Sequence, residues 1–167
     1  MTQIWLSLGS NLQPERHLCM ALRELARHLG KAQISPVYET AAEGFSGPDF
    51  LNMVAGYHTG LPAAALITLL ADVEESLGRV RGREKFSSRS IDIDLLTYGD
   101  EVVTDCGKHL PRHDIIDYAF ELKPLADIAP HQLHAVTGKS FSQHWREFAS
   151  KPRHMRQVSP ALIGAAC

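Results

Sequence analysis

Two aspartates separated by one residue follow a dense basic segment in the middle of the chain. Five of the 17 Lys and Arg residues lie between Arg79 and Arg89, and Asp92 and Asp94 come directly after them. Carboxylate oxygens suit Mg²⁺, and a guanidinium group can hold two phosphate oxygens at once. This combination of basic and acidic residues predicts a binding site for a polyphosphate and its metal ion.

The two aspartates have the period of a β-strand. Ile91, Ile93 and Leu95 alternate with Asp92 and Asp94, as in a strand with one apolar face. The carboxylates then point the same way, with Cβ atoms roughly 6 to 7 Å apart, so that both can reach one cation or a close pair. The alternative interpretation is a solvated strand face beside an exposed basic loop, and the nearby arginines favour the metal site.

The segments before the aspartates predict the elements that position them. Alternating apolar residues predict a first strand over residues 4–8, which Gly9-Ser10-Asn11 ends. Leucines at spacings of four, three and four predict a helix between Pro14 and Gly30. We further expect a strand over residues 34–40 that Pro36 weakens, a loop over 44–48 and a strand over 50–58.

The clearest helix begins near Pro62 and ends before Gly78, because its apolar residues again follow spacings of four, three and four. After the aspartate strand, Tyr98-Gly99-Asp100 is typical of a turn into Glu101–Val103, which would make a hairpin. The element order through Tyr98 is βαββαβ. We therefore predict an α+β fold with the ferredoxin-like split βαβ arrangement: an antiparallel sheet, helices packed on it and an added β-hairpin.

The C-terminal third has weaker patterns. We expect a mostly irregular region packed on the sheet between Leu110 and Pro130, and a short helix over residues 140–149 from the spacing of its aromatic residues. Residues 1–150 are predicted to form a single domain. Residues 151–167, with two prolines and several small residues, are predicted to be a loosely attached tail.

Composition limits the classes of function. A length of 167 residues fits one domain, and the net charge of −2 gives no reason to expect nucleic acid. The three cysteines lie far apart, which predicts neither a disulfide framework nor a zinc ribbon and makes a reducing cytoplasm the expected location. No segment offers about 18 consecutive apolar residues, so we expect no membrane association. Nine histidines form no ligand pattern on a predicted element, which favours structural or solvated roles.

Six short segments together resemble a known enzyme family. They are Leu8–Leu12, Val37–Thr40, Phe50–Asn52, Glu74–Arg81, Arg89–Leu96 and Phe120–Pro130. In this order and spacing the chain resembles the 6-hydroxymethyl-7,8-dihydropterin pyrophosphokinases. That family transfers the terminal pyrophosphate of ATP to the hydroxymethyl group of a pterin in folate biosynthesis.

The resemblance implies roles on the phosphate side. Asp92 and Asp94 would hold two Mg²⁺ ions that bridge the phosphates of ATP, the co-substrate. Arg79 and Arg89 would steady those phosphates and, with the two aspartates, form the catalytic set. The other residues placed near the nucleotide are Glu74, Arg81, Arg112 and His113. The chain has no P-loop motif, so ATP would bind without one.

The resemblance also implies a pterin pocket. Asn52 would read the amide edge of the pterin, whose ring would lie between Phe50 and Phe120. The backbone from Thr40 to Gly44 would complete the pocket. Phe86 occupies the place of the basic-loop aromatic residue, which is commonly Trp in the family.

The chain departs from the family pattern near the phosphates. Pro111-Arg112-His113 replaces the usual Pro-His, so either Arg112 substitutes for the phosphate-facing His or His113 supplies it. Tyr118 stands where an Arg normally precedes the stacking aromatic residue. Ala41 and Ala42 replace the usual prolines. A lost guanidinium contact costs roughly 1.5 to 3 kcal/mol, which predicts a slower enzyme or a divergent paralogue for a related pterin.

Two other classes compete with an enzyme. A non-catalytic, small-ligand-sensing module is compatible with a ferredoxin-like fold, but paired metal-binding carboxylates beside arginines favour catalysis. RNA binding would require Lys or Arg around the aromatic residues of the central strands, and the predicted first and third strands have neither. We expect small-molecule partners only, no nucleic acid and no membrane, and a monomer.

Overall fold

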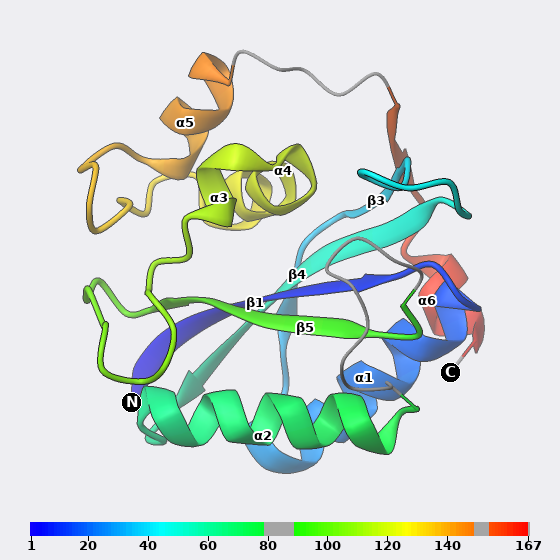
Figure 1. Cartoon of the computed structure of the whole chain (residues 1–167), viewed down its shortest axis with the longest axis horizontal. Helices are drawn as coiled ribbons and strands as arrows, with labels where there is room; N and C mark the ends of the chain where they lie inside the picture. Colours follow the sequence, from blue (N-terminus) through cyan, green and yellow to red (C-terminus); the bar gives the residue numbers. More distant parts are fainter. Residues whose placement is uncertain (79–88, 149–153, 167) are drawn as a thin grey trace.

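The computed structural model describes residues 1–78, 89–148 and 154–166, which fold into an antiparallel sheet with helices on both faces (Figure 1). Within these ranges the sheet has six strands: β1 (Thr2–Ser10), β2 (Gln33–Ile34), β3 (Val37–Thr40), β4 (Phe50–Thr59), β5 (Asp92–Tyr98) and β6 (Met155–Val158). The helices are α1 (Pro14–Leu29), α2 (Ala63–Ser76), α3 (Asp114–Asp117), α4 (Ala119–Ile128), α5 (Phe141–Glu147) and α6 (Ala161–Ala166).

The sheet brings the ends of distant strands together. Its order is β5-β1-β4-β3-β6, with β2 paired to β4, and every pair is antiparallel. The register places Gly9 of β1 between Asn52 of β4 and Asp92 of β5, and Ser7 opposite Asp94. Neighbouring strands lie about 4.8 Å apart, so these residues form one row at the end of the sheet.

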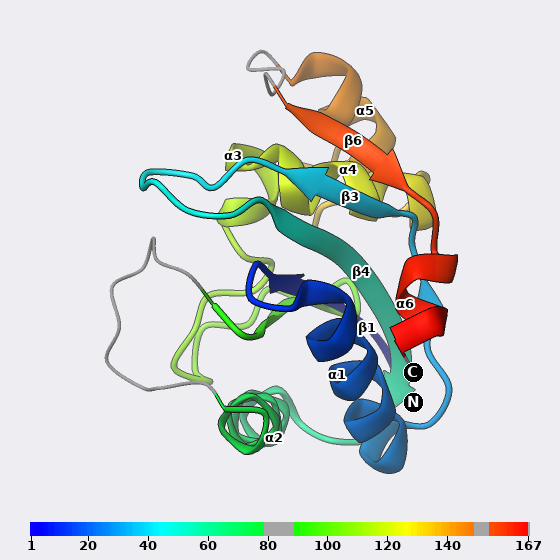
Figure 2. The ribbon, with the colours of Figure 1, turned by 90° about the vertical axis from the view of Figure 1, so that its right-hand side faces the viewer.

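The two faces of the sheet have different cores. Ile4, Leu6 and Leu8 pack with buried residues of α1 and α2 on one face. Trp5 packs with Leu96 and with buried residues of α4 on the other face. Helices α1 and α2 lie on one side of the sheet, and α3, α4 and α5 lie on the other (Figures 1 and 2). The alternation of a strand therefore assigns Ser7 and Gly9 to the α4 side.

Most elements through β5 agree with the sequence prediction. Helix α1 begins at Pro14 and is followed by Gly30, whose φ of 81° is the left-handed conformation that glycine favours after a helix. The predicted second strand is divided into β2 and β3 at Ser35 and Pro36. Proline has no N–H to donate to a neighbouring strand, which explains the interruption.

The prediction of an irregular region between Leu110 and Pro130 was wrong for its second half. Helix α4 occupies Ala119–Ile128 and buries Leu122, Leu125 and Ala126 at helical spacing. Pro124 lies inside this helix and Glu121 is buried on it, and both conceal the amphipathic pattern. Helix α5 agrees with the predicted helix over residues 140–149, and the side chain of its N-cap Ser140 accepts a hydrogen bond from the Gln143 N–H.

The predicted hairpin after β5 is not formed by Glu101–Val103. Val103 instead makes an isolated antiparallel bridge with Leu110, and Val102 is 53% exposed. The Tyr98-Gly99-Asp100 turn is present, and Glu101 and Val102 after it are exposed, while Val103 packs against the main core.

The described part of the C-terminal segment is not a loosely attached tail, contrary to the prediction. Strand β6 pairs with β3 from Val37–Val158 to Thr40–Met155, and α6 packs against α1. Val158 and Ile163 are buried in the main core. A four-residue strand between polar segments has too short a pattern to be recognised from sequence. Among the described residues, none of the helices is both long and apolar enough to span a bilayer.

Candidate active site

A cavity of about 390 Å³ opens at the row of Gly9, Asn52 and Asp92, where β1 ends and β4 and β5 begin. Ser7, Gly9 and Asn52 line its floor, while α4 and the connection between β3 and β4 supply its walls. The Trp5 core fills the same sheet face further along the strands. The cavity therefore begins where large apolar side chains on this face give way to small and polar ones.

Aromatic side chains form one half of the cavity. Phe50 of β4 and Phe120 of α4 both line it. Phe45 meets Phe50 edge to face, with ring centroids 6.3 Å apart, and Tyr118 stacks on Phe120 at 5.2 Å. Aromatic walls on a concave site favour a flat, conjugated ligand.

Asn52 is the polar group of this aromatic half. Its Nδ2 donates to the Thr40 hydroxyl at 2.7 Å, and both residues are buried. A Cβ atom at Gly9 would lie 2.7 Å from the Asn52 Oδ1, so Gly9 leaves room for the amide. Thr40 and Gly9 together fix an amide group that can recognise the edge of a heterocycle.

Acidic and basic side chains form the other half. Asp92 and Asp94 are both half-buried and alternate with buried apolar residues along β5, as the sequence predicts. Arg112 Nη1 donates to Asp94 Oδ1 at 2.9 Å, and Lys108 Nζ lies 3.5 Å from the same oxygen. Arg112 also pairs with Asp114 through its second terminal nitrogen. The carboxylate charge of Asp94 is therefore balanced by cations from outside β5.

Arg89 is held by its backbone at the mouth of the cavity. Its N–H donates to Asn11 Oδ1 at 2.7 Å, while Asn11 Nδ2 donates to the Pro48 carbonyl at 3.1 Å. Arg89 is 8% exposed and lines the cavity. Asn11 thus joins the end of β1 to Arg89 and to the connection between β3 and β4.

Glu121 is a buried carboxyl group in the wall beside Arg112. It is 3% exposed, and none of the described residues forms a hydrogen bond with its Oε2. Burial raises its pKa to about 8, and the negative charge of Asp94 adds to this effect, while Arg112 opposes it. At neutral pH the metal-free protein therefore holds this carboxyl largely protonated.

The structure brings most predicted site residues into one cavity. Those that line it are Thr40, Phe50, Asn52, Arg89, Asp92, Asp94, Arg112 and Phe120. Between the two alternatives left by Pro111-Arg112-His113, it is Arg112 that lines the cavity, and His113 stacks on His109 at 4.3 Å. The predicted residues Arg79, Arg81 and Phe86 lie outside the described residues.

Two predicted residues take other positions. Glu74 is buried on α2, where its Oε1 accepts a hydrogen bond from the Ile93 N–H at 2.6 Å. It therefore supports the backbone of β5 between the two aspartates, because α2 packs beside that strand. Gly44 lies in the connection between β3 and β4 with a φ of 74°, while its neighbours Glu43 and Phe45 line the cavity.

Sequence reasoning missed Glu121, Asp114 and Phe45 as cavity residues. Asp114 orients Arg112, and Phe45 extends the aromatic wall. No local pattern distinguishes Glu121 from a solvated helix residue, since its burial follows from the position of α4. Phe45 had a weak signal, because it is an aromatic residue inside a predicted glycine-rich loop.

The sequence matches a family model over residues 5–130, described as 7,8-dihydro-6-hydroxymethylpterin-pyrophosphokinase (HPPK). The chain belongs to the HPPK family. It is 33% identical over 154 residues to the 2-amino-4-hydroxy-6-hydroxymethyldihydropteridine pyrophosphokinase of Aquifex aeolicus, covering 91% of this chain and 96% of the relative. A relative of the same name from Methylorubrum extorquens is 37% identical over 134 residues, which cover 78% of this chain and 84% of the relative.

Solved structures agree on the HPPK fold. A variant of Plasmodium falciparum HPPK-DHPS crystallised with SDX-DHP has a TM-score of 0.76 and 14% sequence identity. The match covers 94% of this chain and 49% of that chain, so this chain spans about half of that longer protein. At this identity the likeness concerns the fold.

The HPPK-family residues in the cavity fit a magnesium ion. Asp92 and Asp94 offer hard oxygen ligands from one strand face, which is the donor type that Mg²⁺ prefers. Arg112 already pairs with Asp94, so a cation bound at that oxygen would replace an existing ion pair. The open cavity beside both carboxylates leaves room for the water and phosphate oxygens that usually complete magnesium coordination.

Proposed function

We propose that this chain transfers pyrophosphate from ATP to the hydroxymethyl group of 6-hydroxymethyl-7,8-dihydropterin and releases AMP. The observation that carries the proposal is the single cavity in which Asp92 and Asp94 face an aromatic slot containing Asn52. Membership of the HPPK family and the names of its relatives support the same reaction. The product would be the activated pterin of folate biosynthesis.

The aromatic half would bind and orient the pterin. Phe50 and Phe120 would hold the ring, and the Asn52 amide would pair with its polar edge. The hydroxymethyl group would then lie toward the acidic half, where its oxygen attacks the β-phosphorus of ATP. The bond from that phosphorus to the oxygen bridging to the α-phosphorus breaks, AMP leaves, and the hydroxyl proton is released.

The charged half would bind and orient the triphosphate. Asp92 and Asp94 would hold two Mg²⁺ ions, which neutralise phosphate charge when they are bound. Arg89 and Arg112 would contact phosphate oxygens, and we propose the same role for Arg79 and Arg81. The protein then contributes positioning and electrostatic stabilisation, which dominate phosphoryl transfer.

AMP release tests this function directly. The full chain is incubated with ATP, Mg²⁺ and 6-hydroxymethyl-7,8-dihydropterin, and Asp92→Asn is compared with Asp72→Asn, which changes an exposed aspartate of α2. We expect Asp92→Asn to lower the rate by about 100-fold or more, since it removes a metal ligand, and Asp72→Asn to leave it unchanged. Absence of AMP from the unmodified chain would contradict the assigned activity, and an active Asp92→Asn would contradict the assigned site.

A related pterin is a second candidate substrate. Tyr118 and Glu121 both line the cavity, and Tyr118 stacks on Phe120 beside the proposed ring position. Compared with a site that has the family's usual Arg in place of Tyr118, these side chains offer different hydrogen bonds to the pterin and to its substituent. The same assay with pterins that differ at carbon 6 distinguishes the two candidates by the ratio of kcat/KM values.

We also propose boundaries for the catalytic unit. The cavity is lined by residues from Ser7 to Glu121, which supports a single pyrophosphokinase domain whose catalytic part lies within residues 1–150, while β6 and α6 complete its sheet and core. Strand β4 lies between β1 and β3, which supports the split βαβ arrangement of ferredoxin-like folds. The cytoplasmic location and the monomeric state stay predictions of the sequence.

A further inference from the structure

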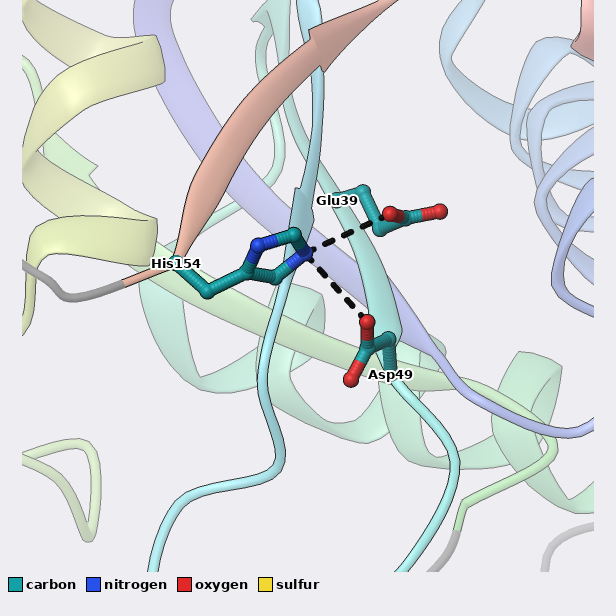
Figure 3. Close-up of side chains that lie close together, drawn as sticks. All are labelled: Glu39, Asp49 and His154. Carbon is teal, nitrogen blue, oxygen red and sulfur yellow. Dashed lines mark hydrogen bonds and ion pairs between the residues drawn. The ribbon is translucent and has the colours of Figure 1, made fainter.

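An imidazole and two carboxylates converge at the edge of the sheet, outside the lining of the active-site cavity. His154 Nε2 lies 3.3 Å from Glu39 Oε1 and 3.3 Å from Asp49 Oδ2. Figure 3 shows the three side chains directed toward a common point. Glu39 belongs to β3, Asp49 directly precedes β4, and His154 directly precedes β6.

The spacing of these atoms fits a small coordination polyhedron. Ligand atoms of a tetrahedral zinc ion with bonds of about 2.0 to 2.1 Å lie about 3.3 Å from one another. Both separations from His154 have this length, and the three ligand atoms all lie within 4.8 Å of one another. A cation could therefore bind with small side-chain movements and with water as its fourth ligand.

We propose that Glu39, Asp49 and His154 form a binding site for a divalent transition-metal ion of the zinc type. The imidazole selects this class over Mg²⁺ and Ca²⁺, which prefer oxygen ligands throughout. The two carboxylates supply the negative charge that compensates the cation. All three side chains are between 28% and 46% exposed, so the ion can enter from solvent.

Arg156 is the competitor for one ligand. Its Nη2 lies 3.1 Å from Glu39 Oε1, and together with His154 it keeps the pKa of Glu39 below its usual value. The Arg156 side chain is 65% exposed, so it can turn into solvent when the cation binds. Exposed ion pairs of this kind contribute little to stability, and the metal would replace this one.

The position of the site links it to the edge of the active-site cavity. Glu39 directly precedes Thr40, and Asp49 directly precedes Phe50, and both following residues line the cavity. A bound ion would join β6 to both ends of the connection between β3 and β4. The metal-bound protein should therefore resist unfolding more strongly than the metal-free protein.

His28 provides a matched internal control. Its Nε2 lies 3.5 Å from one carboxylate, Glu24 Oε1, and the exposures of that pair are 44% and 28%. The His154 and Glu39 pair has the same two values. The difference between the two sites is the second carboxylate, Asp49.

The test is a Zn²⁺ titration of the full chain followed by nitrogen-15 NMR of the histidine side chains. His154→Ala assigns the His154 signals, and His28→Ala assigns the control. We expect the His154 ring signals to change and saturate at free Zn²⁺ concentrations at least about tenfold below those that affect His28. Asp49→Asn should shift the His154 response to the concentration range of His28.

Three results would overturn the proposal: no change at His154, a response no stronger than that of His28, or an unaltered response in Asp49→Asn. In each case His154 serves only as an ion-pair partner. The measurement contains neither ATP nor pterin and reports on one ring. Its outcome is therefore separate from that of the AMP assay, and zinc bound at the catalytic aspartates does not affect the interpretation.

Discussion

Replacing Glu121 by Gln tests how burial acts on the carboxyl group in the active-site wall. The side chain is 3% exposed, and its Oε2 has no hydrogen-bond partner within the part of the chain that the structure describes. Burial raises its pKa from 4.5 to about 8, with a further contribution from Asp94, against the opposing effect of Arg112. Gln keeps the shape of the protonated side chain and remains neutral at every pH.

The sign follows from proton binding by the two states. Between pH 4.5 and about 8 the folded protein holds a proton on Glu121 that the unfolded chain releases. Raising the pH through this range therefore lowers the free energy of unfolding, by up to about 1.4 kcal/mol per pH unit. Below pH 4.5 both states are protonated, so this effect disappears there.

Glu121→Gln is expected to remove the whole of this pH dependence. Its free energy of unfolding should nearly equal that of the unmodified protein at pH 4.5 and exceed it by about 2 to 4 kcal/mol at pH 8, after allowance for relaxation of the site. Urea unfolding at half-unit pH steps measures the difference. A chelator is included because a bound cation would change the charge near Asp94.

A matched control separates burial from carboxylate loss. Glu101 is exposed after the turn that follows β5, and Glu101→Gln removes the same charge from the surface. The free energy of unfolding of this variant should stay within about 0.5 kcal/mol of that of the unmodified protein at every pH between 4.5 and 8. The result that refutes this expectation is a gain in the free energy of unfolding from Glu121→Gln that does not increase between pH 5 and pH 8. Glu121 would then be ionised in the folded protein.

Three further substitutions test other contacts. Gly9→Ala places a Cβ atom 2.7 Å from Asn52 Oδ1. Pterin binding measured by fluorescence should therefore weaken by about tenfold or more, while ATP binding is retained. An unchanged pterin affinity would contradict the role of Gly9. Gly56→Ala places a Cβ atom 2.2 Å from the Trp5 ring. It should lower the free energy of unfolding, measured in urea, by about 2 to 4 kcal/mol. If this free energy falls by less than it does for a Gly→Ala substitution at the surface, the close packing of Trp5 on Gly56 is contradicted. Arg112→Met removes the cation 2.9 Å from Asp94. Mn²⁺ should therefore bind the ATP-free protein about tenfold more tightly, as measured by electron paramagnetic resonance. Weaker Mn²⁺ binding would show instead that Arg112 helps to form the metal site.

The sequence determined the features that depend on local periodicity. The alternation around Asp92 and Asp94 predicts a strand with both carboxylates on one face, and β5 has this arrangement. The two leucine-rich helices and the glycine after α1 also follow from local spacing. The set of short segments from Leu8 to Pro130 was enough to indicate the HPPK family, which the family model confirms.

Only the tertiary structure decided which of these groups meet and how they are charged. Glu121 enters the cavity because α4 packs on the Trp5 face of the sheet. Arg112 lines it from the segment before α3, where its N–H donates to the Leu96 carbonyl at 2.9 Å. Nothing in the residues next to either side chain encodes these contacts. The attachment of β6 to β3 likewise brings His154 beside Glu39 from a distance of 115 residues along the chain. Burial and the distances between charges depend on the whole fold, whereas strand and helix periods depend on a few consecutive residues, and this is the reason for the division.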